Sequence, residues 1–387
     1  MNLGDLLALD IDTMRFVLVA SVVAGAALYA RLGVTAAGTL TAAYVVLLVL
    51  AREWSTLAGV AVVSAVSFVL VRVVATRWFP FTKAWLFIGF VAVSSVVTAL
   101  LVVTFRLTGP VSLPGSVDVL VVVGSFVTPG LVAYDLATQG PRATAWGFAA
   151  VVSGTLVLTV PVLVLANLAT PESSTVTVEA AGRIPDGWFW LAAIASVAFS
   201  GAVRLSFGLH VAGFLGAVFL AEFLTPEAFV TVIASATVAH LATEVLRGRL
   251  VLTPRQRFHV EFLLGALVAW FGLYWGARVG WRPAQEANRY ALEPLLAVGL
   301  LATDMGRVRG GAVRTVVGLI AATGFVASVL WFAGRGDTAS ATTAAAILVV
   351  GSGLLATPAV RTLRASWRNT EALGRSITPR LAGRRVG

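Results

Sequence analysis

Two short stretches of this chain read almost alike: GLVAYDL at residues 130–136 and GLLATDM at residues 299–305. At a constant offset of 169 residues the match pairs Gly130 with Gly299, Ala133 with Ala302 and Asp135 with Asp304. Apolar helices resemble one another by composition alone, so the paired glycines and the paired carboxylates carry the comparison. The chain therefore contains an internal repeat, and its fold follows from what is repeated.

The composition places both copies in a lipid bilayer. Hydrophobic residues make up 58% of the 387 residues and charged residues 12%, whereas a soluble domain is about 45–50% apolar and about 25% charged. Several apolar runs approach the roughly 20 residues that span a bilayer. Between charged or Pro- and Gly-rich breaks we predict thirteen helices, near residues 14–30, 34–51, 55–74, 84–105, 117–134, 143–166, 187–203, 208–224, 228–246, 258–277, 288–303, 312–333 and 341–359.

Further matches extend the repeat on both sides. Gly33, Gly38 and Arg72 correspond to Gly208, Gly213 and Arg247 at an offset of 175, and Thr144 and Gly147 correspond to Thr315 and Gly318 at 171. Drifting offsets are what insertions and deletions in loops produce. Six predicted spans separate matched points, so the two copies share one orientation and form a parallel repeat.

We therefore predict an all-α, polytopic integral membrane protein. Residues 1–170 form the first six-helix repeat, 187–335 the second, 336–360 an additional transmembrane helix and 361–387 a basic cytoplasmic tail. With the N-terminus outside, 20 of the 28 basic residues fall on the inner side. Because positive charge accumulates on cytoplasmic segments, we expect a multi-pass plasma-membrane protein with its N-terminus outside and its C-terminus in the cytoplasm.

Several kinds of chemistry are excluded by the residues present. The chain has no cysteine, which excludes disulfides, thiolate nucleophiles and cysteine-ligated clusters. Its single lysine, Lys83, lies in Thr-Lys-Ala and not in a phosphate-binding Gly-Lys-Ser/Thr loop, so ATP would have to be bound by another chain. The basic tail lacks a second basic element to accompany it, and we expect no nucleic-acid partner.

The segment TPGLVAYDLATQG at residues 128–140, followed by Arg142 and Thr144, resembles the signature of the PgsC/CapC family. The matching positions are Pro129, Gly130, Leu131, Ala133, Asp135, Gln139, Gly140, Thr144 and Gly147. An aromatic and a basic residue before glycines, at Tyr29, Arg31, Gly33 and Gly38, echo the family's first helical hairpin. In the second copy Val298 stands at the place of Pro129, and Gln139 has no counterpart.

The resemblance implies a membrane component of poly-γ-glutamate synthesis and export. In such systems a separate ATP-dependent amide ligase makes the polymer, so this chain would not be catalytic alone. It would hold the ligase, together with a further membrane subunit, and help the polyanion cross the bilayer. The residues implied in polymer or partner contact are Pro129, Gly130, Asp135, Gln139, Gly140, Arg142, Gly299, Asp304, Arg307, Arg309, Arg31 and Tyr29.

The residues themselves support a local interpretation of this segment. Pro129 lacks an N–H group and Gly130 permits unusual backbone angles, so we expect the last turns of the fifth helix to loosen. Asp135 and Asp304, each near arginines, would then form a polar site between the repeats. The alternative is that each aspartate pairs with an arginine only to stabilise the fold. An aspartate at a helix C-terminus opposes the helix dipole, which favours the functional interpretation.

Other charged residues have simpler explanations. Glu261 lies four residues after Arg257 and Glu293 four after Arg289, spacings typical of ion pairs on one helix. His240 and Glu244 also share a helix face, but two ligands are too few for a metal, and we predict no metal and no cofactor.

Two other functions stay open. A secondary transporter or channel for a small anion predicts broken helices and ionisable groups near the membrane midplane. A sensory or scaffolding multi-span module predicts no substrate path.

Overall fold

The computed structural model describes residues 11–35, 39–75, 83–108, 119–169, 189–223, 226–249, 252–287, 292–307 and 311–361. Within these ranges the chain forms helices and the turns between them, without a strand. Gly38, Arg309 and the tail after Arg361, all named above, lie outside the described residues.

Helices occur at every predicted span. The first copy contains α2 (Ile11–Leu32), α3 (Thr39–Leu50), α4 (Trp54–Val69) with a π-helical continuation (Leu70–Ala75), α6 (Lys83–Thr108), α7 (Val119–Gln139) and α8 (Pro141–Ala169). The second contains α9 (Phe189–Phe207), α10 (Gly216–Phe223), α11 (Pro226–Arg247), α12 (Pro254–Arg278), a short α13 (Arg282–Ala287), α14 (Glu293–Met305) and α15 (Gly311–Ala333). A last helix, α16 (Thr338–Ala346), continues through a π-helical turn (Ile347–Gly351) as one apolar span, Thr338–Arg361.

Within the described residues, eight helices are long and apolar enough to cross a membrane. Their outward faces carry large apolar side chains that a lipid bilayer would solvate, among them Val157, Leu165, Phe271, Val313 and Trp331. The protein is therefore an all-α, polytopic membrane protein, as its composition predicts.

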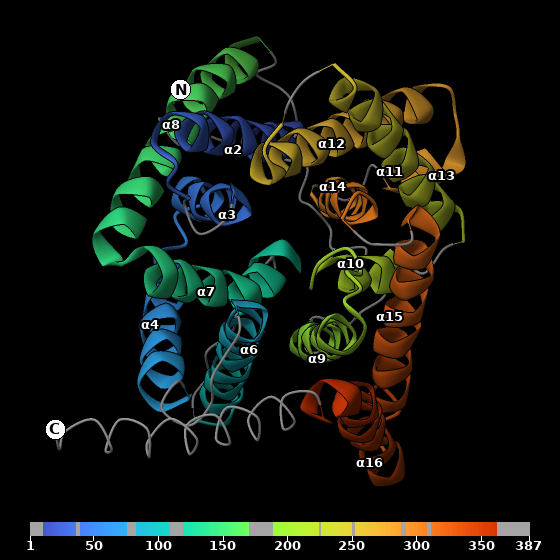
Figure 1. The fold of residues 1–387 in the computed structure, drawn as a ribbon. Helices are drawn as coiled ribbons and strands as arrows, with labels where there is room; N and C mark the ends of the chain where they lie inside the picture. The colour runs from blue at the N-terminus through green and yellow to red at the C-terminus, as the bar shows by residue number, and fades with distance from the viewer. Residues whose placement is uncertain are drawn as a thin grey trace, which may run out of the picture.

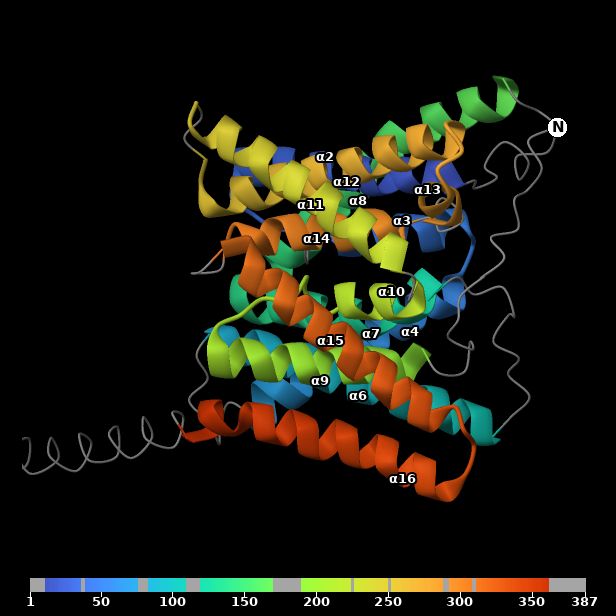
Figure 2. The ribbon, with the colours of Figure 1, turned by 90° about the vertical axis from the view of Figure 1, so that its right-hand side faces the viewer.

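The two copies have the same internal packing. In the first, α2 packs on α3 and α8, and α7 packs on α4 and α6; in the second, α9 packs on α10 and α15, and α14 packs on α11 and α12. The copies lie side by side in Figure 1, the first in blue and green and the second in yellow and orange. Figure 2 shows α16 at one edge of the bundle, where it packs against α15.

The interface between the copies is reciprocal. The first helix of each copy packs on the fourth helix of the other: α2 on α12, and α9 on α6 (Figure 1). Such an exchange of equivalent surfaces is what an approximate two-fold axis generates. The α2–α12 pair is antiparallel, because Trp270 Nε1 donates to Asp12 Oδ1 (2.9 Å) at one end, while the Tyr29 and His259 rings lie 6.1 Å apart toward the other.

The second helix of each copy is shorter than predicted. The sequence predicts spans at 34–51 and 208–224, but α3 has 12 residues and α10 has 8, and residues 208–215 form an irregular connection. The first helices end at Gly33 and Gly208, both with φ +65°, a left-handed conformation that glycine adopts readily. An eight-residue helix rises only about 12 Å, well short of the roughly 30 Å hydrocarbon core.

This shortened segment is enclosed by protein. The α10 residues Ala217, Val218, Phe219, Leu220 and Ala221 are at most 1% exposed. The irregular connection before them is held by Ser196 Oγ, which donates to the Phe214 carbonyl at 2.6 Å. Non-helical backbone at membrane depth is tolerated in such places, because protein groups satisfy it.

The fifth helix also differs from its prediction. It was expected to loosen near Pro129 and end near residue 134, but α7 continues through Pro129 to Gln139. Gly130 serves a close helix crossing instead: a Cβ there would lie 2.6 Å from Ser94 Oγ and 2.7 Å from Val91 Cα of α6. The extra helical turn carries Asp135 and Gln139 to the connection after α2.

Candidate functional site

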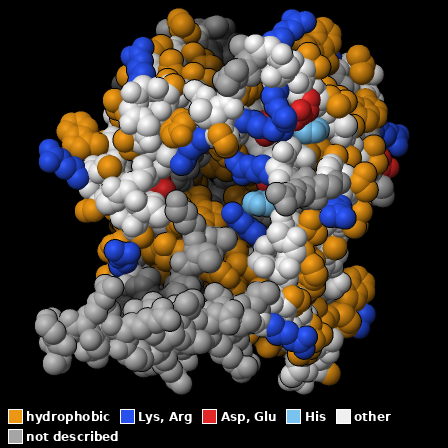
Figure 3. Space-filling model, in the orientation of Figure 1, with side chains coloured by type: hydrophobic (Ala, Val, Ile, Leu, Met, Phe, Trp, Pro, Cys, Tyr) orange, Lys and Arg blue, Asp and Glu red, His pale blue; other side chains and the backbone are white. Residues whose placement is uncertain are grey.

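The polar residues of interest lie where the repeated helices end. Asp135 and Asp304 are in the last turns of α7 and α14, and the connections after α2 and α9 come to meet them. Figure 3 shows basic side chains, with histidine and acidic groups among them, across the middle of one face of the molecule.

In the first copy, Asp135 binds the connection after α2. Thr35 Oγ1 donates to Asp135 Oδ2 at 2.8 Å, and both side chains are buried. Gln139, one turn later in α7, also binds Thr35. Its Oε1 accepts from the Thr35 amide (2.9 Å), and its Nε2 donates to the Thr35 carbonyl (3.2 Å) and contacts Thr35 Oγ1. The aspartate and the glutamine together fix the backbone that leaves the first helix.

In the second copy, Asp304 binds the corresponding connection. The Gly213 amide donates to Asp304 Oδ2 at 3.0 Å, and His210 Nδ1 lies 3.6 Å from Oδ1. At 3.6 Å the contact of His210 with Asp304 is long for a hydrogen bond, so the Gly213 amide holds this carboxylate more closely than His210 does.

The two sites correspond position by position. Thr35 and His210 stand at the 175-residue offset, and each faces the aspartate of its own copy. Gly147 and Gly318 give the connections room, because a Cβ at either would lie 2.7 Å from a Cγ1 atom, of Val34 and of Val211 respectively. The carboxylates thus hold two separate connections, one in each copy, where the sequence suggested one polar site between the repeats.

The glycines at the start of each signature segment bring helices together. Gly130 lies against the backbone of α6, and Gly299 lies so close to α12 that a Cβ on Gly265 would be 2.8 Å from Gly299 Cα. Gly140 has φ +86° and links α7 to α8, and its carbonyl accepts hydrogen bonds from both the amide and the hydroxyl of Thr144. Pro129 is buried inside α7.

Two arginines, Arg204 and Arg307, lie near the second aspartate, Asp304. The Arg307 guanidinium lies 4.9 Å from the centre of the Phe258 ring, and Arg204 lies 5.0 Å from the centre of Phe87. The two phenylalanines stand at the 171-residue offset, so they hold equivalent places in the two copies. Both guanidiniums act electrostatically on Asp304. A cation over an aromatic face is held without losing its charge, so both stay able to attract an anion.

The remaining predicted basic and aromatic residues lie apart from these hydrogen bonds. Arg31 and Arg142 are exposed, at the end of α2 and the start of α8. Tyr29, on α2, contacts α12 of the other copy, because the Arg255 guanidinium lies 5.3 Å from the centre of the Tyr29 ring.

Two residues of the second site, Arg204 and His210, were not predicted from the sequence. At the 175-residue offset, Arg204 corresponds to Tyr29 and His210 corresponds to Thr35. Extending the repeat comparison to these two pairs would have identified both residues as candidates.

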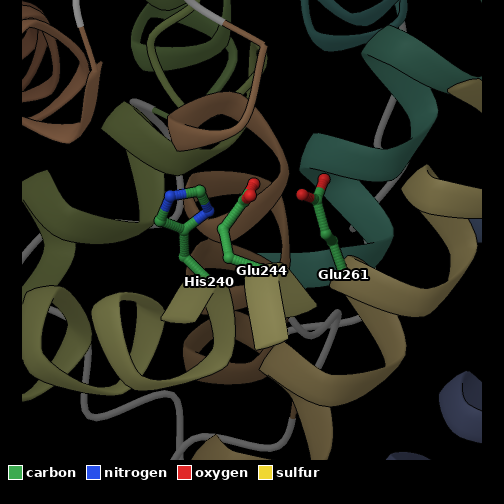
Figure 4. A group of neighbouring side chains, drawn as sticks. All are labelled: His240, Glu244 and Glu261. Carbon is green, nitrogen blue, oxygen red and sulfur yellow. The ribbon is translucent and has the colours of Figure 1, made fainter. Parts of the chain in front are cut away.

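A second polar cluster lies between α11 and α12. The predicted ion pair is confirmed, with Arg257 Nε 2.7 Å from Glu261 Oε1. Glu244 of α11 joins it, since Arg257 Nη2 lies 2.6 Å from Glu244 Oε1. His240 lies beside them, and Figure 4 shows the three side chains His240, Glu244 and Glu261 extending from the two helices toward a common region. The other predicted pair, Glu293 with Arg289, lies outside the described side chains.

Comparison with known proteins gives one match. A family model described as "Capsule biosynthesis CapC" matches the chain twice, over residues 20–145 and 195–316. The two matched segments lie in the two structural copies and include both aspartate sites. No curated protein and no solved structure matches the chain.

Proposed function

The chain belongs to the capsule biosynthesis CapC family, and from that premise we propose that it is the membrane subunit of a poly-γ-glutamate synthase and export complex. A separate ATP-dependent ligase would make the polymer at the cytoplasmic face. This chain would hold the ligase, with a further membrane subunit, and pass the growing polyanion outward.

One observation carries the proposal: the family's signature segment occurs twice, and each time its aspartate holds the connection after the first helix of its copy. In both copies this connection precedes a shortened helix that is enclosed by protein. Breaks of this kind are found where a membrane protein lines a path for its substrate. The aspartates would therefore set the shape of the path rather than react.

The charge around the second site fits an anionic substrate. Arg204 and Arg307 lie near Asp304, and Arg31 and Arg142 are exposed at helix ends of the first copy. Carboxylates of a poly-γ-glutamate chain would be attracted to such guanidiniums. We also propose the orientation and the division predicted above: N-terminus outside, two repeats (1–170 and 187–335), an added span (336–360) and a cytoplasmic tail (361–387) available to the ligase.

The test is polymer yield. The cognate ligase is expressed with this chain, without it, and with the double variant Asp135→Asn/Asp304→Asn, and γ-linked glutamate on the cell surface is measured. We expect polymer to require the chain and to fall strongly in the double variant. Asp337→Asn is the matched control, because Asp337 only caps α16, where its carboxylate accepts from the Ser340 amide at 2.7 Å.

Each outcome decides a separate point. Polymer lost without the chain but kept in the double variant would preserve the role and remove the aspartates from it. Polymer unchanged in every strain would refute the synthase assignment, and would leave the scaffolding module that the sequence allows.

A second candidate is a secondary transporter or channel for a small anion, and the shortened α3 and α10 favour it as well. It predicts anion flux in proteoliposomes containing this chain alone. The synthase subunit predicts no such flux without its ligase.

A further inference from the structure

Three metal-ligating side chains meet where α11 crosses α12. His240 and Glu244 lie one turn apart on α11, and Glu261 faces them from the second turn of α12 (Figure 4). One ligand atom from each side chain lies within 4.8 Å of the other two. Ligands around a tetrahedral ion at 2.0–2.1 Å stand about 3.4 Å apart, so modest side-chain rotation would close the set around an ion.

Two atoms of this cluster have no partner within the described part of the chain. The Glu261 side chain is 1% exposed, yet its Oε2 accepts no hydrogen bond there, and His240 Nδ1 likewise has none. A carboxylate oxygen can only accept, so leaving it buried and unpaired is costly. A cation at this point would satisfy both atoms.

Arg257 is placed to support a cation rather than replace it. It binds Oε1 of Glu261 and Oε1 of Glu244, which leaves the Oε2 atoms of both carboxylates for another partner. Ligating carboxylates commonly accept such outer hydrogen bonds, which fix their orientation. Glu244 Oε2 lies 3.2 Å from Arg247, whose side chain is 55% exposed and can turn to water when a cation arrives.

The first copy shows that the fold does not require these charges. At the 171-residue offset, Leu86 and Phe90 stand where the second copy has Arg257 and Glu261. There Leu86 and Phe90 pack with Phe68 and Val71 in an apolar cluster at the equivalent crossing of α4 and α6. The same architecture is thus built with apolar side chains in one copy and with ionisable groups in the other.

We propose that His240, Glu244 and Glu261 bind a divalent transition-metal ion of the zinc and manganese class. One imidazole nitrogen with two carboxylate oxygens suits these ions, whereas magnesium and calcium prefer oxygen ligands throughout. Glu244 is 37% exposed, which gives the ion a route from the aqueous side. The site uses none of the hydrogen bonds of the aspartate sites, although Arg257 and Glu261 lie against Gly306, just after Asp304 at the end of α14. The proposal does not depend on the proposed polymer.

The experiment is a binding titration on the purified, chelator-treated full chain in detergent, with Mn²⁺ followed by electron paramagnetic resonance and Zn²⁺ by competition. We expect saturable binding of one ion per chain. Glu261→Gln should weaken it by more than the roughly 10–100-fold typical of losing an outer-shell partner. Glu227→Gln, at the opposite end of α11, is the matched control and should bind as the parent chain does.

Thermal unfolding gives a second reading. Because an ion that binds only the folded chain stabilises it, Mn²⁺ should raise the Tm of the parent chain and of Glu227→Gln but not of Glu261→Gln. If Glu261→Gln yields too little folded chain, His240→Gln tests the same site and should bind Zn²⁺ less tightly. Absence of saturable binding, equal binding in the site variants, or equal competition by Mg²⁺ would overturn the proposal. Polymer yield does not enter any of these readings.

Discussion

The crossing of α4 with α6 and the crossing of α11 with α12 occupy equivalent places in the two copies, yet they are built from opposite chemistry. The first is a contact of Phe68, Val71, Leu86 and Phe90, and the second contains Arg257, Glu261 and Glu244. Apolar packing alone is therefore sufficient to build this helix crossing. The charged residues of the second copy therefore either neutralise one another or bind a ligand, and substitutions can distinguish these two roles.

The largest effect is expected from breaking the ion pair on one side only. Arg257→Leu leaves the buried Glu261 carboxylate without its cation, and we expect the free energy of unfolding to fall by about 3–5 kcal/mol. Arg257→Leu/Glu261→Phe transplants Leu86 and Phe90 of the first copy and should recover most of that loss. Unfolding in detergent, followed by circular dichroism, measures both. A double variant as unstable as the single one would show that the two crossings are not interchangeable.

A smaller effect is expected at the signature glycines, and it should differ between copies. Gly130→Ala places a methyl group 2.7 Å from Val91 Cα and 2.9 Å from the Phe90 carbonyl, so two backbones must separate, at a cost of about 1–3 kcal/mol. Gly299→Ala meets the ring of the buried Phe262 at 2.8 Å, so the first adjustment there is a shift of one side chain and not the separation of two helix backbones. Thermal unfolding of the two variants should therefore rank Gly130→Ala as the more damaging. The reverse order would contradict the close backbone crossing of α6 and α7.

The smallest effect is expected at His210, whose counterpart in the first copy is Thr35. His210 Nδ1 lies 3.6 Å from Asp304 Oδ1, whereas the Gly213 amide donates to Asp304 Oδ2 at 3.0 Å. His210→Thr, which introduces the residue found at the matching position of the first copy, should therefore change the Tm little, because the hydrogen bond that holds the connection is kept. Thermal unfolding measures this, and a large fall in Tm would show that the His210 side chain itself anchors the connection.

Much of the fold could be predicted from the sequence, because apolar runs bounded by charge correspond directly to helices in a bilayer. Every predicted span contains a helix, and the matched glycines correctly indicated two copies. The predictions were wrong where local backbone conformation sets the helix ends. The left-handed Gly208 and Gly213 shorten the predicted span 208–224 to α10, and α7 continues past Pro129. The short α13, with the polar sequence RPAQEA, has no apolar pattern to reveal it.

The sites were predicted less completely, for a physical reason. Asp135, Gln139 and Asp304 could be named because they lie in the repeated motif, but their partners lie some 90–105 residues away in sequence. The metal set shows the same limit: His240 and Glu244 share a helix face, whereas Glu261 reaches them only through the crossing of two helices. Spacing along one helix can be read from a sequence, and the meeting of two helices cannot.

The reciprocal packing of α2 on α12 and of α9 on α6 has a consequence for stoichiometry. A self-complementary interface of this kind can join two identical chains, and every feature would then appear in pairs. Joining the halves in one polypeptide removes that constraint, because each half can acquire substitutions that its counterpart lacks. The described part of the chain thereby holds two aspartate-anchored connections but one histidine–glutamate cluster, a two-to-one ratio that no symmetric homodimer of a single repeat could maintain.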